Sequence, residues 1–404
     1  MEARKKWDIL SIATIPLTMT LANSMLIPVL PAMQKALAIS SLQASLIITA
    51  YAFVAILFIP PAGYLSDRYG RKAVILPSLL IVSAAGAAAG IVAALGLNRS
   101  YGLILGARLV QGLGSAGCFP VVLPLVGDLF RSKEDVSKGL GLVETANTFG
   151  KVVSPILGSA LAIWSWYAPF FAIPVFSLVS FLLVAIFVKP SGASDKKNAA
   201  GSGGGLVEFL KSIRALLKEK GKWLYAIFAI GGIGMFAIFG SLFYLSESLE
   251  QRGMKPLTKG LVLAVPLGGL CLVSFLAGKW IGENKPRMKW TSFAGLTVST
   301  GALLALGFSG LNASWWIVAM LALSSAGIGA ALPSLDALLT EGIDKKQRGT
   351  VTSLYSSMRF IGVAAGPPVS ALLMRGSMSA LFLTTGATLL AAALINAFAI
   401  RPER

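Results

Sequence analysis

Long apolar runs alternate with short charged segments along the whole chain. A membrane-spanning helix needs about 20 predominantly apolar residues, and each of these runs is long enough. We therefore predict twelve spanning helices, at about 8–31, 42–65, 73–96, 101–128, 137–163, 166–188, 223–247, 257–281, 289–309, 313–340, 349–374 and 378–400. This pattern is typical of an all-α membrane protein that crosses the bilayer twelve times.

The composition supports this interpretation. Of the 404 residues, 55% are hydrophobic and 13% are charged, whereas a soluble domain has about 25% charged residues. The first apolar run follows a basic segment, as in a signal peptide, but it is too long and lacks a clear cleavage site. We expect it to be retained as a helix, and we expect a multi-pass protein of the inner (plasma) membrane in contact with lipid.

The formal net charge of +18 would suggest a nucleic-acid partner in a soluble protein. Here the lysines and arginines concentrate in every second segment between the apolar runs, beginning with the N-terminal one. Lysine and arginine are enriched in cytoplasmic loops. The distribution therefore predicts cytoplasmic N- and C-termini and no nucleic-acid partner.

A polar segment divides the predicted helices six and six. It covers residues 189–222, between a six-helix unit at 1–188 and another at 223–404. Its first part is rich in Ser, Gly and Lys, which is typical of a flexible linker, and residues 206–217 repeat apolar positions at helical spacing, which predicts an amphipathic helix on the membrane surface. Two such units around a central site are typical of secondary transporters.

A charged loop lies between the second and third predicted helices. Its distinctive positions are glycines and charged residues: Gly63, Asp67, Arg68, Gly70, Arg71 and Lys72. The sequence resembles the signature loop of the major facilitator superfamily. The resemblance implies that Asp67 docks against the start of helix eleven, that Arg71 reaches Asp128 at the inner end of helix four, and that this cluster closes the inner side.

Two further elements resemble that superfamily. Arg108 and Gln111 in helix four match a motif associated with proton transfer in its exporters. Helix five resembles the antiporter element at Gly150, Ser154, Pro155 and Gly158, with serine in place of glycine at 154 and at 159. Small residues at this spacing allow helices to pack closely. The resemblance implies the twelve-helix drug:proton antiporter group, and we expect the small-residue face to contact the other six-helix unit.

Helix five also carries a polar stripe of Glu144, Asn147 and Lys151. An ionisable residue near the middle of a bilayer costs about 2.5–3.5 kcal/mol or more, so such residues usually face an interior and have a function. We expect Glu144 to carry a proton and to meet Arg108, with Asp336 as the second candidate carrier. The substrate cavity is expected to contain Asn23, Gln111, Asn147, Lys151 and Arg359, the last of which is also able to pair with Asp336.

Export of small amphipathic compounds in exchange for protons is the leading functional hypothesis. Lys151 keeps a second one open, the export or uniport of a defined anionic or zwitterionic solute such as a sugar, an amino acid or a lipid-linked molecule. A sensor or scaffold of the same fold is the third. We expect no enzyme activity, no cofactor and a monomer. The chain lacks histidine and has two cysteines, which argues against a histidine-based metal site, and no phosphate-binding loop indicates a nucleotide.

Overall fold

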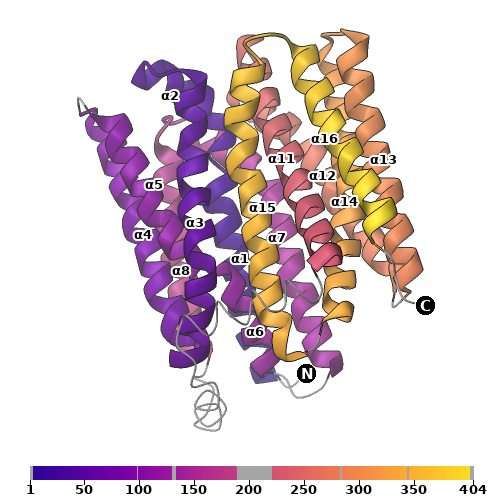
Figure 1. Ribbon diagram of the computed structural model, residues 1–404. Coiled ribbons are helices and arrows are strands. Elements are labelled where there is room, and N and C mark those ends of the chain that lie inside the picture. The colour runs from indigo at the N-terminus through magenta and orange to yellow at the C-terminus, as the bar shows by residue number, and fades with distance from the viewer. Residues whose placement is uncertain are drawn as a thin grey trace.

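The computed structural model describes residues 3–97, 99–129, 133–188, 221–282, 284–343 and 345–400. Within these ranges the regular structure is entirely helical. The predicted amphipathic helix at 206–217 lies outside the described residues and stays a prediction. Figure 1 shows the helices running roughly side by side, with both termini at the same end of the bundle. We call this the terminal end.

The first-half helices are α1 (Ala3–Ser24), η1 (Ile27–Val29), α2 (Leu30–Leu37), α3 (Ser41–Tyr69), α4 (Arg71–Leu95), α5 (Ser100–Ala116), α6 (Phe119–Leu129), α7 (Lys133–Leu161) and α8 (Ala168–Phe187). The second-half helices are α11 (Gly221–Gln251), α12 (Pro256–Ile281), α13 (Lys285–Ser309), α14 (Ser314–Gly342), α15 (Lys345–Leu373) and α16 (Met378–Ala399).

Two predicted spans are each interrupted once. Pro28 and Pro31 lie in the first turns of η1 and α2, and Pro120 lies at the start of α6, just after the break at Gly117 and Cys118. Proline lacks a backbone N–H and fits most easily in the first turn of a helix, where that N–H would have no intrahelical partner. These three prolines lie where a helix restarts, whereas Pro155 lies inside α7, as membrane-spanning helices allow.

Ten segments are long and apolar enough to cross a membrane, and α7 and α15, of 29 residues each, complete the twelve predicted helices. These two helices are long enough, but they are more polar than the other ten and are therefore not among the segments apolar enough to cross a membrane. They also lie at the contact between the halves: α7 packs against α1 and α12, and α15 packs against α11 and α3. Interior helices in a membrane protein can be polar because they face each other and not lipid.

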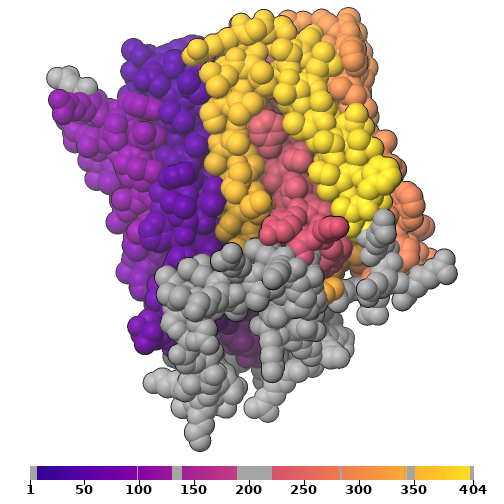
Figure 2. Space-filling model, viewed as in Figure 1, coloured from indigo at the N-terminus to yellow at the C-terminus, as the bar shows by residue number. Residues whose placement is uncertain are grey.

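Figure 2 shows α15 along the boundary between the first-half and second-half helices. One hydrogen bond across this boundary runs from Thr49 Oγ1 of α3 to the carbonyl oxygen of Ala364 of α15, at 2.7 Å. Nearer the terminal end, a Cβ added at Gly63 would lie 3.6 Å from Ser353 Oγ. The two helices thus stay close over most of their length.

The small-residue face of α7 contacts a different neighbour from the one expected. A Cβ added at Gly158 would lie 2.0 Å from the carbonyl oxygen of Met25, and one at Gly150 would meet Leu17 and Thr20. Both contacts are with the α1 segment of the same half, so the expectation that this face meets the other half is wrong. The other half is met by an adjacent face, because a Cβ at Gly260 of α12 would lie 2.6 Å from Pro155 O and Ser159 Cβ.

This packing predicts opposite effects for two Gly→Ala substitutions. Alanine at position 106 of α5, where an added Cβ meets nothing within 4 Å, is expected to be neutral or to stabilise by up to about 1 kcal/mol through helix propensity. Alanine at position 158 would force α7 away from Met25, and overpacking of this kind costs about 1–3 kcal/mol. Thermal unfolding of the two purified variants in detergent measures the difference, and equal melting temperatures would contradict the packing.

Candidate functional site

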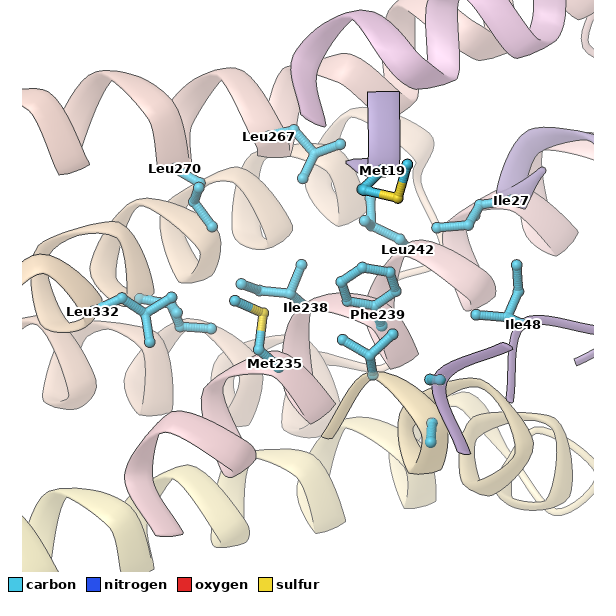
Figure 3. Packing of buried hydrophobic residues seen from close by; sticks show 14 of the residues in the cluster. Met19, Ile27, Ile48, Met235, Ile238, Phe239, Leu242, Leu267, Leu270 and Leu332 are labelled. Carbon is cyan, nitrogen blue, oxygen red and sulfur yellow. The ribbon is translucent and has the colours of Figure 1, made fainter. Parts of the chain in front are cut away.

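A cavity of about 90 Å³ lies between the two halves. Its lining comes from the α1, α3, α6 and α7 helices of the first half and from α11 and α15 of the second. The lining residues are Met19, Thr20, Asn23, Ser24, Tyr51, Phe119, Asn147, Lys151, Met235, Phe239, Ser356, Arg359, Phe360 and Val363. Most of the wall is apolar, and Figure 3 shows Met19, Met235 and Phe239 in this region. A few polar groups among apolar walls are typical of a small-molecule site.

Two cations line this cavity, Lys151 from α7 and Arg359 from α15. Arg359 Nη1 lies 3.6 Å from Asp336 Oδ2, so the pairing considered from the sequence is present. Lys151 has no ion pair within 4 Å among the described residues, although Glu144, Asp336 and Arg359 are near enough to act on it electrostatically. Four charged groups from both halves therefore lie close enough to influence one another, and Lys151 is the cation among them without an ion pair within 4 Å.

The polar stripe of α7 is connected by hydrogen bonds. Thr20 Oγ1 donates to Asn147 Oδ1 at 2.6 Å, and Asn147 Nδ2 donates to Glu144 Oε1 at 3.2 Å. Asn147 and Lys151 line the cavity, whereas Glu144 is exposed one turn closer to the terminal end. The stripe thus leads from an accessible carboxylate to the cavity.

Arg108 does not contact Glu144, which corrects the expected pairing. Its side chain is fully buried. Nε donates to Ile47 O at 3.0 Å, and Nη1 donates to Ala22 O at 3.3 Å and to Gln111 Oε1 at 2.6 Å. Nη2 donates to Asn23 Oδ1 at 2.8 Å. The physical reason is that α5 packs on α3 and lies beside the α1 carbonyls, whereas the main neighbours of α7 are α1 and α12.

Gln111 is also placed differently from the prediction. It is fully buried and does not line the cavity. Its Oε1 accepts the Arg108 bond, and its Nε2 has no hydrogen-bond partner. Residues at i and i+3 share a helix face, so Gln111 follows Arg108 into the interior of the first half. Asn23, Asn147, Lys151 and Arg359 are the predicted residues that the cavity contains.

The charged loop between α3 and α4 has the pairing that the family resemblance implies. Arg71 Nε lies 3.2 Å from Asp128 Oδ2, and Arg71 also pairs with Asp67. Gly70 has φ +98°, a conformation that favours glycine. Lys72 Nζ donates to Ala185 O and Val188 O. Docking of Asp67 against the first turn of α15 involves side chains outside the described residues.

At the opposite end of the bundle, polar contacts join the halves, and the sequence did not suggest them. Lys35 Nζ lies 2.7 Å from Glu250 Oε1, and Lys259 Nζ lies 3.1 Å from Glu250 Oε2. Gln34 bonds to Glu247, and Ser246 Oγ donates to Ile27 O. Lys259, in the first turn of α12, is 2% exposed. Glu247 and Glu250, three residues apart near the end of α11, were the feature of the sequence that could have indicated these contacts. We call these residues the outer cluster.

We expect the outer cluster to hold this end closed. Replacing Glu250 by Gln removes two ion pairs, one of them between the halves, and leaves Lys259 buried without its counter-ion, which favours separation. In a background with Cys118 and Cys271 changed to Ser, labelling of a Ser24→Cys cavity residue by a membrane-impermeant thiol reagent should rise several-fold. Lys255→Gln, an exposed change at the same end, is the control. Equal labelling in both variants would show that the cluster does not hold the halves.

A cavity between the first-half and second-half helices of a membrane protein, with apolar walls and two cations, is typical of a transporter. The sequence profile of the Major Facilitator Superfamily matches residues 12–362 and 249–404. The chain belongs to this superfamily and is a multi-pass protein of the inner membrane.

Curated relatives with similar sequences include exporters. The chain is 47% identical to the bacillibactin exporter of Bacillus subtilis over 379 residues, which cover 93% of this chain and 92% of the relative. It is 26% identical to the class G tetracycline resistance protein of Vibrio anguillarum, with 85% and 84% covered. Among solved structures, a D-xylose-proton symporter superposes with a TM-score of 0.78 at 15% identity, covering 99% of this chain and 98% of that one. The human organic anion transporter MFSD10 superposes with a TM-score of 0.71 at 20% identity, covering 98% and 100%. The solved structures support the fold alone.

Proposed function

We propose that this transporter exports an anionic, partly aromatic compound by alternating access. The observation that carries the proposal is Lys151, a cation that lines the central cavity without an ion-pair partner within 4 Å among the described residues. A fixed charge in a site with low-dielectric walls attracts a substrate of opposite sign and repels one of the same sign. Tyr51, Phe119, Phe239 and Phe360 supply aromatic surface around it.

The membrane potential itself can drive such export. Moving one elementary charge across 100 mV is worth about 2.3 kcal/mol, and an inside-negative potential pushes an anion outward. The two halves, 1–188 and 223–404, would rock about the α3–α15 and α7–α12 contacts. The outer cluster closes one end, and the Arg71–Asp128 cluster lies near the other.

Proton-coupled export of amphipathic drugs is the second candidate. Glu144 favours this candidate, because its carboxylate is exposed and accepts a hydrogen bond from Asn147, which lines the cavity. Asp336 is the alternative proton carrier, although Arg359 holds it in an ion pair. The relative named as a tetracycline resistance protein is consistent with this candidate.

The 47% identical relative supplies the first compound to test. The chain should be expressed in a strain that makes bacillibactin but lacks its exporter, and extracellular bacillibactin should be followed over time. We expect secretion to be restored, and a Lys151→Met variant expressed at the same level should restore much less. If secretion stays at the level of the empty vector while the strain gains resistance to cationic drugs, the second candidate replaces the first.

A further inference from the structure

We propose that Asn23 is a specificity-determining residue that donates a hydrogen bond from Nδ2 to an oxygen of the substrate, and that Arg108 is the positioning residue that fixes this orientation. The inference rests on the proposed export of an anionic compound and adds a second contact point in the cavity that Lys151 lines. It gives the neutral residue at position 23 a role in choosing the charge of the substrate.

The first step is the charge state around Arg108. Its guanidinium is fully buried, and its four hydrogen bonds all go to neutral oxygens: two backbone carbonyls and the side-chain amides of Asn23 and Gln111. It also lies over the Tyr51 ring at 4.6 Å. Among the described residues no carboxylate lies within ion-pair distance of it. A buried guanidinium stays charged, so the first half keeps a fixed positive charge directly behind the cavity wall.

The second step is the orientation of the Asn23 amide. A guanidinium has donors and no acceptor, so the side-chain oxygen of Asn23 must face Arg108, as the 2.8 Å bond from Nη2 shows. The amide nitrogen then points the other way. Asn23 lines the cavity. Its Nδ2 has no hydrogen-bond partner among the described residues, and this atom is not fully buried. The cavity wall therefore presents an unused N–H donor at this place.

The third step is selectivity. The positive charge of Arg108 polarises the amide and strengthens Nδ2 as a donor, since hydrogen bonds assisted by charge are stronger than neutral ones. An aspartate at position 23 would neutralise Arg108 and would place a carboxylate oxygen where the donor now lies. Asparagine at position 23 thus preserves both the positive charge of Arg108 and a hydrogen-bond donor in the cavity wall. With Lys151 in the same cavity, the site offers two contacts to an acceptor-rich anion.

The matched test uses Asn23→Asp, which keeps the shape of the side chain and its bond to Arg108. Binding of 2-naphthoate and of 2-naphthylmethylammonium, similar in size and opposite in charge, is measured on purified protein in nanodiscs. We expect the ratio of the two dissociation constants to move by at least tenfold toward the cation in Asn23→Asp. Arg108→Gln should move the ratio in the same direction, whereas a purely structural role would weaken both probes equally.

A second readout does not depend on substrate. Because Asn23→Asp gives a buried cation its counter-ion, its melting temperature without ligand should equal or exceed that of the wild type. An unchanged binding ratio in Asn23→Asp, with Lys151→Met still weakening 2-naphthoate, would overturn this inference and leave the proposed function standing. A wild-type protein that does not prefer 2-naphthoate would overturn both.

Discussion

Lys151→Met is expected to lower the affinity for an anionic substrate by about 30-fold or more and to remove most of its export. Removing one partner of a desolvated charge pair costs about 2–5 kcal/mol, and every 1.4 kcal/mol is a factor of ten. Lys151 is the cavity cation without a direct counter-ion, whereas Arg359 is already balanced by Asp336. Methionine keeps the length and apolar volume of the lysine stem, so the change tests the charge.

The measurement is the dissociation constant of the anionic probe and the rate of its export from inverted vesicles. Lys151→Arg, which keeps the charge, should retain part of the activity, and Lys255→Met, which removes an exposed lysine at the opposite end, should behave as the wild type. Unchanged affinity in Lys151→Met would refute the anionic-substrate proposal, because no other described cavity cation lacks a counter-ion.

The twelve helices were predictable from the sequence because membrane spans carry a strong local signal, an apolar run of sufficient length. The polarity of α7 and α15 was also visible, and it correctly marks the helices between the halves. The Arg71–Asp128 pair was implied by the resemblance to the signature loop of the superfamily. The helices and their polarity could be predicted from the residue types and their spacing alone.

The identity of each neighbour was not predictable in the same way. A helix wheel gives the direction of a face but not the helix that covers it, so the Gly158 face was assigned to the wrong partner. Charge complementarity likewise suggested Glu144 for Arg108, whereas a buried guanidinium here is satisfied by carbonyl oxygens. The outer cluster depends on contacts between residues more than 200 positions apart, which one sequence without an alignment does not reveal.

Glu144→Gln separates the two candidate driving forces. Glu144 and Lys151 are seven residues apart on one helix, about 10 Å at 1.5 Å per residue. At that distance two unit charges interact by about 0.4–1.7 kcal/mol for effective dielectric constants between 80 and 20. The Glu144 carboxylate partly cancels the positive potential that Lys151 produces in the cavity. Without this negative charge, the affinity for an anionic probe should rise by about two- to fifteen-fold.

The same variant should lose any response of transport to an imposed pH gradient while keeping its response to the membrane potential. Protonation of Glu144 removes a negative charge that repels an anion, so a proton on Glu144 and an anionic substrate favour each other's binding. Exchange in which proton and substrate compete for the site is therefore suited to a cationic substrate. Vesicles with independently set pH gradient and potential, loaded with wild type, Glu144→Gln or Asp336→Asn, distinguish these cases. Complete loss of transport in Glu144→Gln under a potential alone would contradict potential-driven anion export and favour the proton antiporter. A pH response lost only in Asp336→Asn would move the proton to the ion pair with Arg359.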